Sequence, residues 1–128
     1  MADYPQARDA IFALLDGHTL AGHVLTVYYR LGVDYKSHLP AVLIYHLGGS
    51  EGYIDRTDRV GVDVYATEGT PALDILEQIR DLLVPGPHDT SAGFIDDVAV
   101  ESLPVDTPYA DPAVSFAQMV VRVTARPL

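Results

Sequence analysis

The clearest pattern of apolar and polar positions runs from Asp58 to Leu83, as DRVGVDVYATEGTPALDILEQIRDLL. Between Arg59 and Thr67 the two kinds of residue alternate, which is the period of a half-buried strand. The segment after it carries apolar residues at helical spacing, namely Ala72, Ile75, Leu76, Ile79 and Leu83. A strand and a helix that each have one apolar side, joined by a short turn, are expected to pack against each other.

The turn between this strand and helix has the residues of a helix start. Thr70 stands at the expected N-cap, and Pro71 fits the first helical position, where its missing N–H costs nothing. An earlier amphipathic helix is predicted from Tyr4 to Asp16, again from apolar residues at helical spacing.

Further strands are predicted at both ends of the chain. They are His23 to Arg30, Ala41 to Leu47, Phe94 to Leu103 and Val114 to Ala125. Ala41 to Leu47 and the central strand are expected to pair as a hairpin. The order α-β-β-β-α-β-β predicts an α+β fold, with a mixed or antiparallel sheet and both helices on one face. A length of 128 residues fits a single domain, 1–128.

Connections rich in glycine, proline or aspartate are predicted to be loops, and they are long for so small a domain. They run from Gly48 to Thr57, from Val84 to Gly93 and from Pro104 to Pro112, and Tyr109 is expected to be exposed in the last. Long ordered loops usually carry function or become ordered on assembly, which makes these segments candidates for contacts with other proteins.

Charge narrows the range of partners. The chain has 18 acidic and 8 basic residues, a formal net charge of −10, and no basic stripe. This balance disfavours a grip on nucleic acid and binding to an anionic membrane surface. Cysteine is absent, which excludes disulfides and thiolate metal sites. A secretory signal and an apolar run of about 20 residues are also missing, so a cytoplasmic location is expected.

Candidate catalytic and metal-binding residues lack the spacing that their chemistry requires. The 5 histidines are scattered, and nothing in their spacing enforces the convergence of a zinc site. Asp96 and Asp97 are adjacent in a strand, so they point to opposite faces and form no catalytic pair. Gly48, Gly49 and Gly52 lack the Lys-Ser/Thr of a phosphate-binding loop. We therefore predict no catalytic residues, no metal, no cofactor and no enzymatic activity.

The aromatic residues admit two interpretations. The chain has 8 tyrosines and no tryptophan, and several tyrosines lie in predicted loops or in strands with two apolar faces. This distribution is typical of a protein that buries surface against other subunits. It is equally compatible with tyrosines that cover the edges of the core.

The central strand and helix resemble those of the tail terminator proteins of long-tailed bacteriophages, which are also called minor tail or tail completion proteins. In that family an alternating strand that begins with arginine precedes an Ala-Leu-rich helix ending in Arg-x-x-Leu. The matching residues are Arg59, Val60, Val62, Asp63, Val64 and Tyr65, followed by Ala72, Leu73, Ile79, Arg80 and Leu83. The opening helix ARDAIFALLDG and the long last strand also fit, so the resemblance spans nearly the whole chain.

The resemblance implies a structural virion protein that assembles with itself into a ring, usually a hexamer, on the last ring of the tail tube. Such a ring stops polymerisation of the tube protein and presents a surface to the head–neck connector protein, while DNA passes through without specific binding. It implies the head-proximal end of the tail, and the host cytoplasm during assembly. The expected contact residues lie in the long loops: Tyr53, Ile54, Arg56, His88, Phe94 and Tyr109.

Other functions are compatible with the same sequence. A head-closure or connector protein of the phage neck shares the size and the loops. A protein of another class, a small α+β enzyme or ligand-binding dimer, would use a histidine such as His46 in a pocket between sheet and helix. The tail tube protein itself is disfavoured, because it should consist mostly of strands.

Overall fold

The computed structural model describes residues 4–20, 22–52 and 54–127. Its α-helices are α1 (Ala7–Leu15) and α2 (Ala72–Leu83), and a 3-10 turn, η1, spans Tyr35–His38. The strands of the main sheet are β3 (Thr26–Tyr28), β4 (Ala41–Glu51), β5 (Arg56–Thr67), β8 (Asp97–Asp106) and β9 (Val114–Ala125). Two small hairpins lie beside it, formed by β1 (Thr19–Leu20) with β2 (His23–Val24) and by β6 (His88–Thr90) with β7 (Gly93–Ile95).

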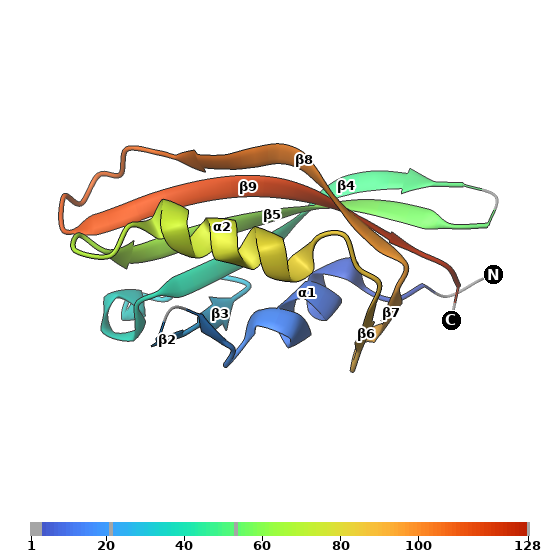
Figure 1. Cartoon of the computed structure of the whole chain (residues 1–128), viewed down its shortest axis with the longest axis horizontal. Helices are drawn as coiled ribbons and strands as arrows, with labels where there is room; N and C mark the ends of the chain where they lie inside the picture. The colour runs from blue at the N-terminus through green and yellow to red at the C-terminus, as the bar shows by residue number, and fades with distance from the viewer. Residues whose placement is uncertain (1–3, 21, 53, 128) are drawn as a thin grey trace.

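The main sheet is mixed, and its order is β3-β4-β5-β9-β8. The short edge strand β3 runs parallel to β4, and the other neighbours are antiparallel. Both α-helices pack on the same face of this sheet, α2 across β5 and β9 and α1 below it near β3 and β4 (Figure 1). The predicted α+β class and the predicted mixed sheet with two helices on one face are confirmed.

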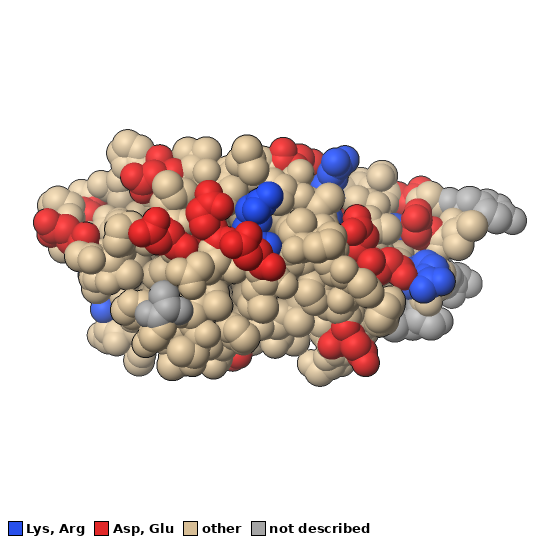
Figure 2. Space-filling model, viewed as in Figure 1, with Lys and Arg blue, Asp and Glu red and all other residues tan. Residues whose placement is uncertain are grey.

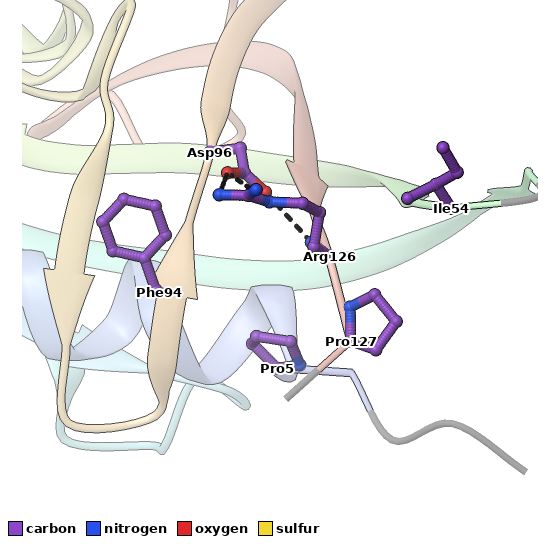
Figure 3. Close-up of a pocket in the computed structure, with 6 residues that line it drawn as sticks. All are labelled: Pro5, Ile54, Phe94, Asp96, Arg126 and Pro127. Atoms are coloured by element: carbon purple, nitrogen blue, oxygen red, sulfur yellow. Dashed lines mark hydrogen bonds and ion pairs between the residues drawn. The ribbon is translucent and has the colours of Figure 1, made fainter.

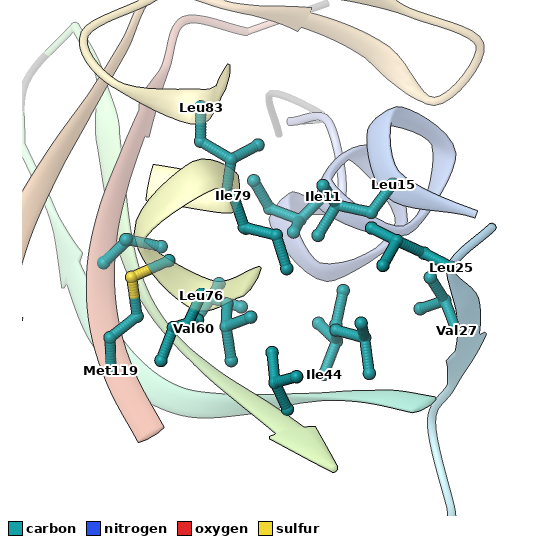
Figure 4. Packing of buried hydrophobic residues seen from close by; sticks show 14 of the residues in the cluster. Ile11, Leu15, Leu25, Val27, Ile44, Val60, Leu76, Ile79, Leu83 and Met119 are labelled. Atoms are coloured by element: carbon teal, nitrogen blue, oxygen red, sulfur yellow. The ribbon is translucent and has the colours of Figure 1, made fainter. Parts of the chain in front are cut away.

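The core lies between the helices and this face of the sheet (Figure 4). Leu15 of α1 and Leu76 and Ile79 of α2 are fully buried there. The sheet contributes alternate residues of three strands, Val42, Ile44, Val60, Val62, Val64, Ala117, Met119, Val121 and Val123. Each fully buried Leu or Ile stabilises the fold by about 1.5–3 kcal/mol, so these two periodic patterns provide much of the driving force.

The predicted loops are shorter than expected, because strands extend into them. The β4–β5 hairpin continues to Glu51 and Arg56, past a bulge between His46 and Gly49. A Cβ at Gly49 would lie 2.1 Å from the carbonyl oxygen of Thr57, so the glycine allows a close approach of two strands. The β6–β7 hairpin occupies part of the second predicted loop, and β8 extends into the third.

The N-terminus of α2 is held by β9 and not by Thr70. The helix begins at Ala72, with Pro71 at the N-cap position and without a cap from that side chain. Instead, the Ala72 N–H donates to the hydroxyl oxygen of Ser115 at 3.0 Å, and this hydroxyl donates to the carbonyl oxygen of Thr70 at 2.9 Å. The prediction that Thr70 caps the helix is therefore wrong.

Replacing Ser115 by alanine is expected to destabilise the protein by about 0.5–2 kcal/mol, which is the usual cost of losing a side-chain cap. The substitution leaves the Ala72 N–H without its acceptor and removes the link between β9 and the turn before α2. Urea unfolding measures the difference. Thr70→Ala is the matched control, and a larger loss for Thr70→Ala than for Ser115→Ala would contradict this account of the cap.

The face of the sheet without helices carries an aromatic cluster at one end. Tyr65 of β5 and Phe116 of β9 lie at its centre, and Tyr109 packs on both with ring centroids 5.4 Å away. The hydroxyl groups of Tyr35 and Tyr109 are 3.1 Å apart. The expectation that Tyr109 is exposed is wrong, because residues 107–113 fold back over the sheet and leave this side chain half-buried.

Candidate functional site

An open hollow of about 530 Å³ lies at the end of the molecule that carries the tip of the β4–β5 hairpin. Segments that are distant in the sequence meet there: the residues before α1, the hairpin tip, β7 and the residues after β9 (Figure 3). The side chains that line this end hollow are Pro5, Ile54, Phe94, Asp96, Arg126 and Pro127. The site is thus assembled by the fold and has no continuous sequence motif.

The apolar residues of the end hollow are unusually exposed for their size. Ile54 is 65% exposed and Phe94 is 44% exposed. Single exposed apolar side chains are common, but two of them on either side of one concave surface favour a site of interaction with proteins or ligands. Aromatic residues in particular are enriched where protein surfaces meet. The end hollow therefore has the composition of a docking surface.

The Asp96–Arg126 salt bridge, which lies between the side chains of Phe94 and Ile54, is the polar part of the end hollow (Figure 3). The Arg126 Nε donates to Asp96 Oδ1 at 3.0 Å, and the backbone N–H of Arg126 donates to Asp96 Oδ2 at 3.0 Å (Figure 3). Because Arg126 is exposed, the ion pair itself contributes only about 0–1 kcal/mol to stability. Its main effect is to fix the residues after β9 beside β7, where they complete the wall of the hollow.

The predicted contact residues fall into separate places. Ile54 and Phe94 both line the end hollow, on opposite sides of the Asp96–Arg126 pair (Figure 3). The ring of His88 instead faces inward, with its Nε2 donating to the carbonyl oxygen of Leu83 at 2.6 Å. Tyr109 lies in the aromatic cluster, among residues at the opposite end of β5. Tyr53 falls outside the described residues.

Arg56, the remaining predicted contact residue, borders a second hollow of about 260 Å³ together with Gln6, Arg8 and His46. Behind it lies the buried Asp58, whose Oδ1 accepts from Arg56 Nε at 3.1 Å and from His46 Nε2 at 2.7 Å. The backbone N–H of Gly48 donates to His46 Nδ1 at 3.3 Å. Both ring nitrogens of His46 are therefore hydrogen-bonded within the chain.

The buried carboxyl group of Asp63, on the face of the main sheet without α-helices, was not predicted from the sequence. Asp63 of β5 is 5% exposed. The Tyr45 hydroxyl donates to Asp63 Oδ1 at 2.9 Å, and the Gln118 Nε2 lies 3.5 Å from Asp63 Oδ2. Burial raises the pKa of Asp63, and the hydrogen bonds from Tyr45 and Gln118 offset part of this effect. Alternation along β5 places Asp63 on this face, but its burial depends on side chains of β4 and β9.

The variant Asp63→Asn is expected to gain stability relative to the wild type as pH rises from acid to neutral. Because the folded-state pKa is raised, the contribution of Asp63 is fully favourable below the unfolded pKa of about 3.9 and is lost as pH rises through the folded pKa. Asparagine has no charge to desolvate and still accepts from Tyr45. Urea unfolding across this pH range tests the sign, with the exposed Asp97→Asn as the control for one lost charge. A stability gain of Asp63→Asn over the wild type that becomes smaller towards neutral pH would contradict the raised pKa of Asp63.

The surface charge is predominantly acidic. Figure 2 shows acidic side chains gathered over α2, where Asp74, Glu77 and Asp81 are exposed. Within the described ranges, no group of three or more His, Cys, Asp or Glu side chains is placed to hold a metal ion. None of the helices in residues 4–20, 22–52 and 54–127 is long and apolar enough to cross a membrane.

Comparisons with known proteins assign no family, since no family model and no curated protein matches the chain.

Proposed function

We propose that this chain is a structural subunit of the tail-terminator type, which assembles with copies of itself into a ring at the end of a phage tail tube. The ring stops polymerisation of the tube protein and offers a joining surface to the head–neck connector protein. The observation that carries this proposal is the end hollow, which is lined by the exposed side chains of Ile54 and Phe94. The resemblance of the central strand and helix to tail terminator proteins supports it.

A second apolar surface lies away from the end hollow, on the edge strand β8. There, Leu103 is 64% exposed and Val105 is 54% exposed. Two concave or flat surfaces of different shape on one chain favour a heterologous contact, in which one surface of a copy meets the other surface of the next. Such a contact repeats around an axis and closes into a ring when the rotation allows it.

The acidic surface agrees with a ring through which DNA moves. With a net charge of −10, the chain has little capacity to neutralise phosphate groups, and counterion release is the main source of non-specific affinity for DNA. DNA would pass such a ring without being held. The virion, at the head-proximal end of the tail, is the proposed location of the assembled protein.

The test is to add the purified chain to polymerising phage tail tube protein, and to image the products by negative-stain microscopy. We expect shorter tubes that end in a ring, and light scattering from the same samples should show rings of this chain. Tubes of unchanged length with bare ends would reject the terminator role. If the chain nevertheless forms rings on its own, a connector protein of the neck becomes the better assignment.

A further inference from the structure

The buried carboxyl group of Asp63 lacks a cationic partner. Among the residues that the structure describes, no Lys, Arg or His forms an ion pair with it. The other buried aspartate, Asp58, is paired with both Arg56 and His46. An isolated buried carboxylate is costly, and proteins normally pair such a group or bind a ligand to it. Of the two buried aspartates among the described residues, Asp63 alone lacks an ion-pair partner.

The hydrogen-bonding capacity of Asp63 is only partly used. A carboxylate has room for about four hydrogen bonds, and among the described residues two side chains donate to this one. The bond from Tyr45 to Oδ1 is of ordinary length at 2.9 Å, whereas Gln118 is 3.5 Å from Oδ2, at the limit of a hydrogen bond. Oδ2 is thus open to a stronger donor, which would displace the side-chain amide of Gln118.

A hollow of about 200 Å³ lies beside the two side chains that bond to Asp63, between β4, β9 and the end of β8. We call it the Gln118 hollow. Its lining residues are Tyr45, Ser102, Val105, Thr107, Gln118, Met119 and Val120. Both side chains that bond to Asp63, Tyr45 and Gln118, therefore also face the hollow. Asp63 itself does not line the hollow, so a ligand there would have to take the place of the Gln118 amide to reach it.

The position of Tyr45 is fixed by Gly61 on the neighbouring strand. A Cβ at Gly61 would lie 2.2 Å from the Tyr45 ring, so the absence of a side chain lets the ring lie flat on β5. This contact directs the Tyr45 hydroxyl at Asp63 before any ligand arrives. One wall of the Gln118 hollow is thus preorganised, which lowers the entropic cost of binding.

The Gln118 hollow suits one long side chain. Sites for drug-sized ligands occupy about 300–1,000 Å³, so this one is too small for them. Arginine and lysine carry an apolar stem that packs on aliphatic residues, here Val120, and a charged head that binds a carboxylate. Arginine fits the hollow better than lysine, because its planar guanidinium can donate to Asp63 and to a second acceptor at the same time. A hard divalent cation would need more oxygen ligands than Asp63 supplies.

We propose that the Gln118 hollow binds a single arginine side chain presented by a basic partner protein, with Asp63 as its counterion. Charge favours a partner of another kind over a second copy of this chain. The chain has 18 acidic against 8 basic residues, and Lys36, Arg56, Arg59, Arg80 and Arg126 already form ion pairs. This inference does not depend on the ring proposed above.

To test this, the isotopically labelled full chain is titrated with N-acetylarginine methylamide at neutral pH. NMR follows the signals of the Asp63 carboxyl group and of the Gln118 side-chain amide. N-acetylcitrulline methylamide, which has nearly the same shape and no charge, is the ligand control. We expect saturable shifts of both groups with arginine only. Asp63→Asn should weaken binding by about tenfold or more, because a charge-assisted pair becomes a neutral one. Asp97→Asn should leave it unchanged.

Two further variants sharpen the result. Gln118→Ala keeps Asp63 and removes the side chain in front of it, so arginine should bind at least as tightly as to the wild type. Equal titrations with arginine and citrulline, or an Asp63→Asn variant that binds like the wild type, would overturn the proposal. So would a change in oligomeric state of Asp63→Asn in light scattering, because it would assign the arginine to a second copy of the chain.

Discussion

Phe94→Asp is expected to leave a folded protein that no longer associates with itself. Phe94 is 44% exposed at the end hollow and contributes little to the core, so the substitution should cost the monomer almost nothing. In an assembled ring it would bury an unpaired carboxylate in an apolar contact. Aromatic residues at the centre of an interface contribute about 2 kcal/mol or more, which corresponds to a loss of affinity of about 30-fold or more.

Light scattering over a concentration series measures this loss, and circular dichroism confirms that the variant is folded. Val33→Asp introduces the same charge at a fully exposed apolar residue before η1 and is the matched control. Leu103→Asp, on the edge strand β8, should weaken association as Phe94→Asp does if the two surfaces meet. If Phe94→Asp associates with itself as strongly as the wild type does, the end hollow is not an interface between copies.

Leu76→Ala is expected to destabilise the monomer by about 2–5 kcal/mol, the usual cost of truncating a buried leucine in a core that cannot collapse around the cavity. Leu76 is fully buried between α2 and the sheet, in the middle of the largest apolar cluster. A loss of this size is a large part of the total stability of a domain, which is typically about 5–15 kcal/mol. Urea unfolding followed by circular dichroism provides the measurement.

Leu103→Ala is the matched control for Leu76→Ala, since it removes the same atoms from a side chain that is 64% exposed. Its effect on the unfolding free energy of the monomer should stay within about 0.5 kcal/mol. Similar losses for the two variants would mean that α2 does not pack on the sheet as described. The comparison therefore tests the packing without reference to any function.

The parts of the fold that follow from periodicity were predictable from the sequence. The alternation in β9 and the helical spacing in α2 each record one buried face, and the structure confirms both. The prediction that β5 is half-buried is wrong, because its second face is covered as well and leaves Asp63 and Tyr65 buried. The start of α2 was not predictable, because its cap comes from Ser115, distant in the chain. The strand extension at Gly49 was hidden for a similar reason: glycine indicates a loop unless a neighbouring strand requires its small size.

The candidate site was predictable only in part. Ile54 and Phe94 were identified because they lie in segments rich in turn residues, but only the fold shows that they share one hollow. Tyr109 has the same kind of sequence context, yet it packs on Tyr65 and Phe116. Local sequence cannot distinguish these cases, because the difference lies in which distant segment covers each residue. The Asp63 network depends on three strands and leaves no local signal.

The most direct test of the central claim is the mass and shape of the wild-type protein in solution, measured by size-exclusion chromatography with light scattering and by negative-stain microscopy across a concentration series. The proposed function predicts closed rings, alone or in the presence of tube protein, built from head-to-tail contacts. A protein that stays monomeric at high concentration and forms no ring when tube protein is added would contradict it. A two-fold dimer as the final assembly would contradict it equally.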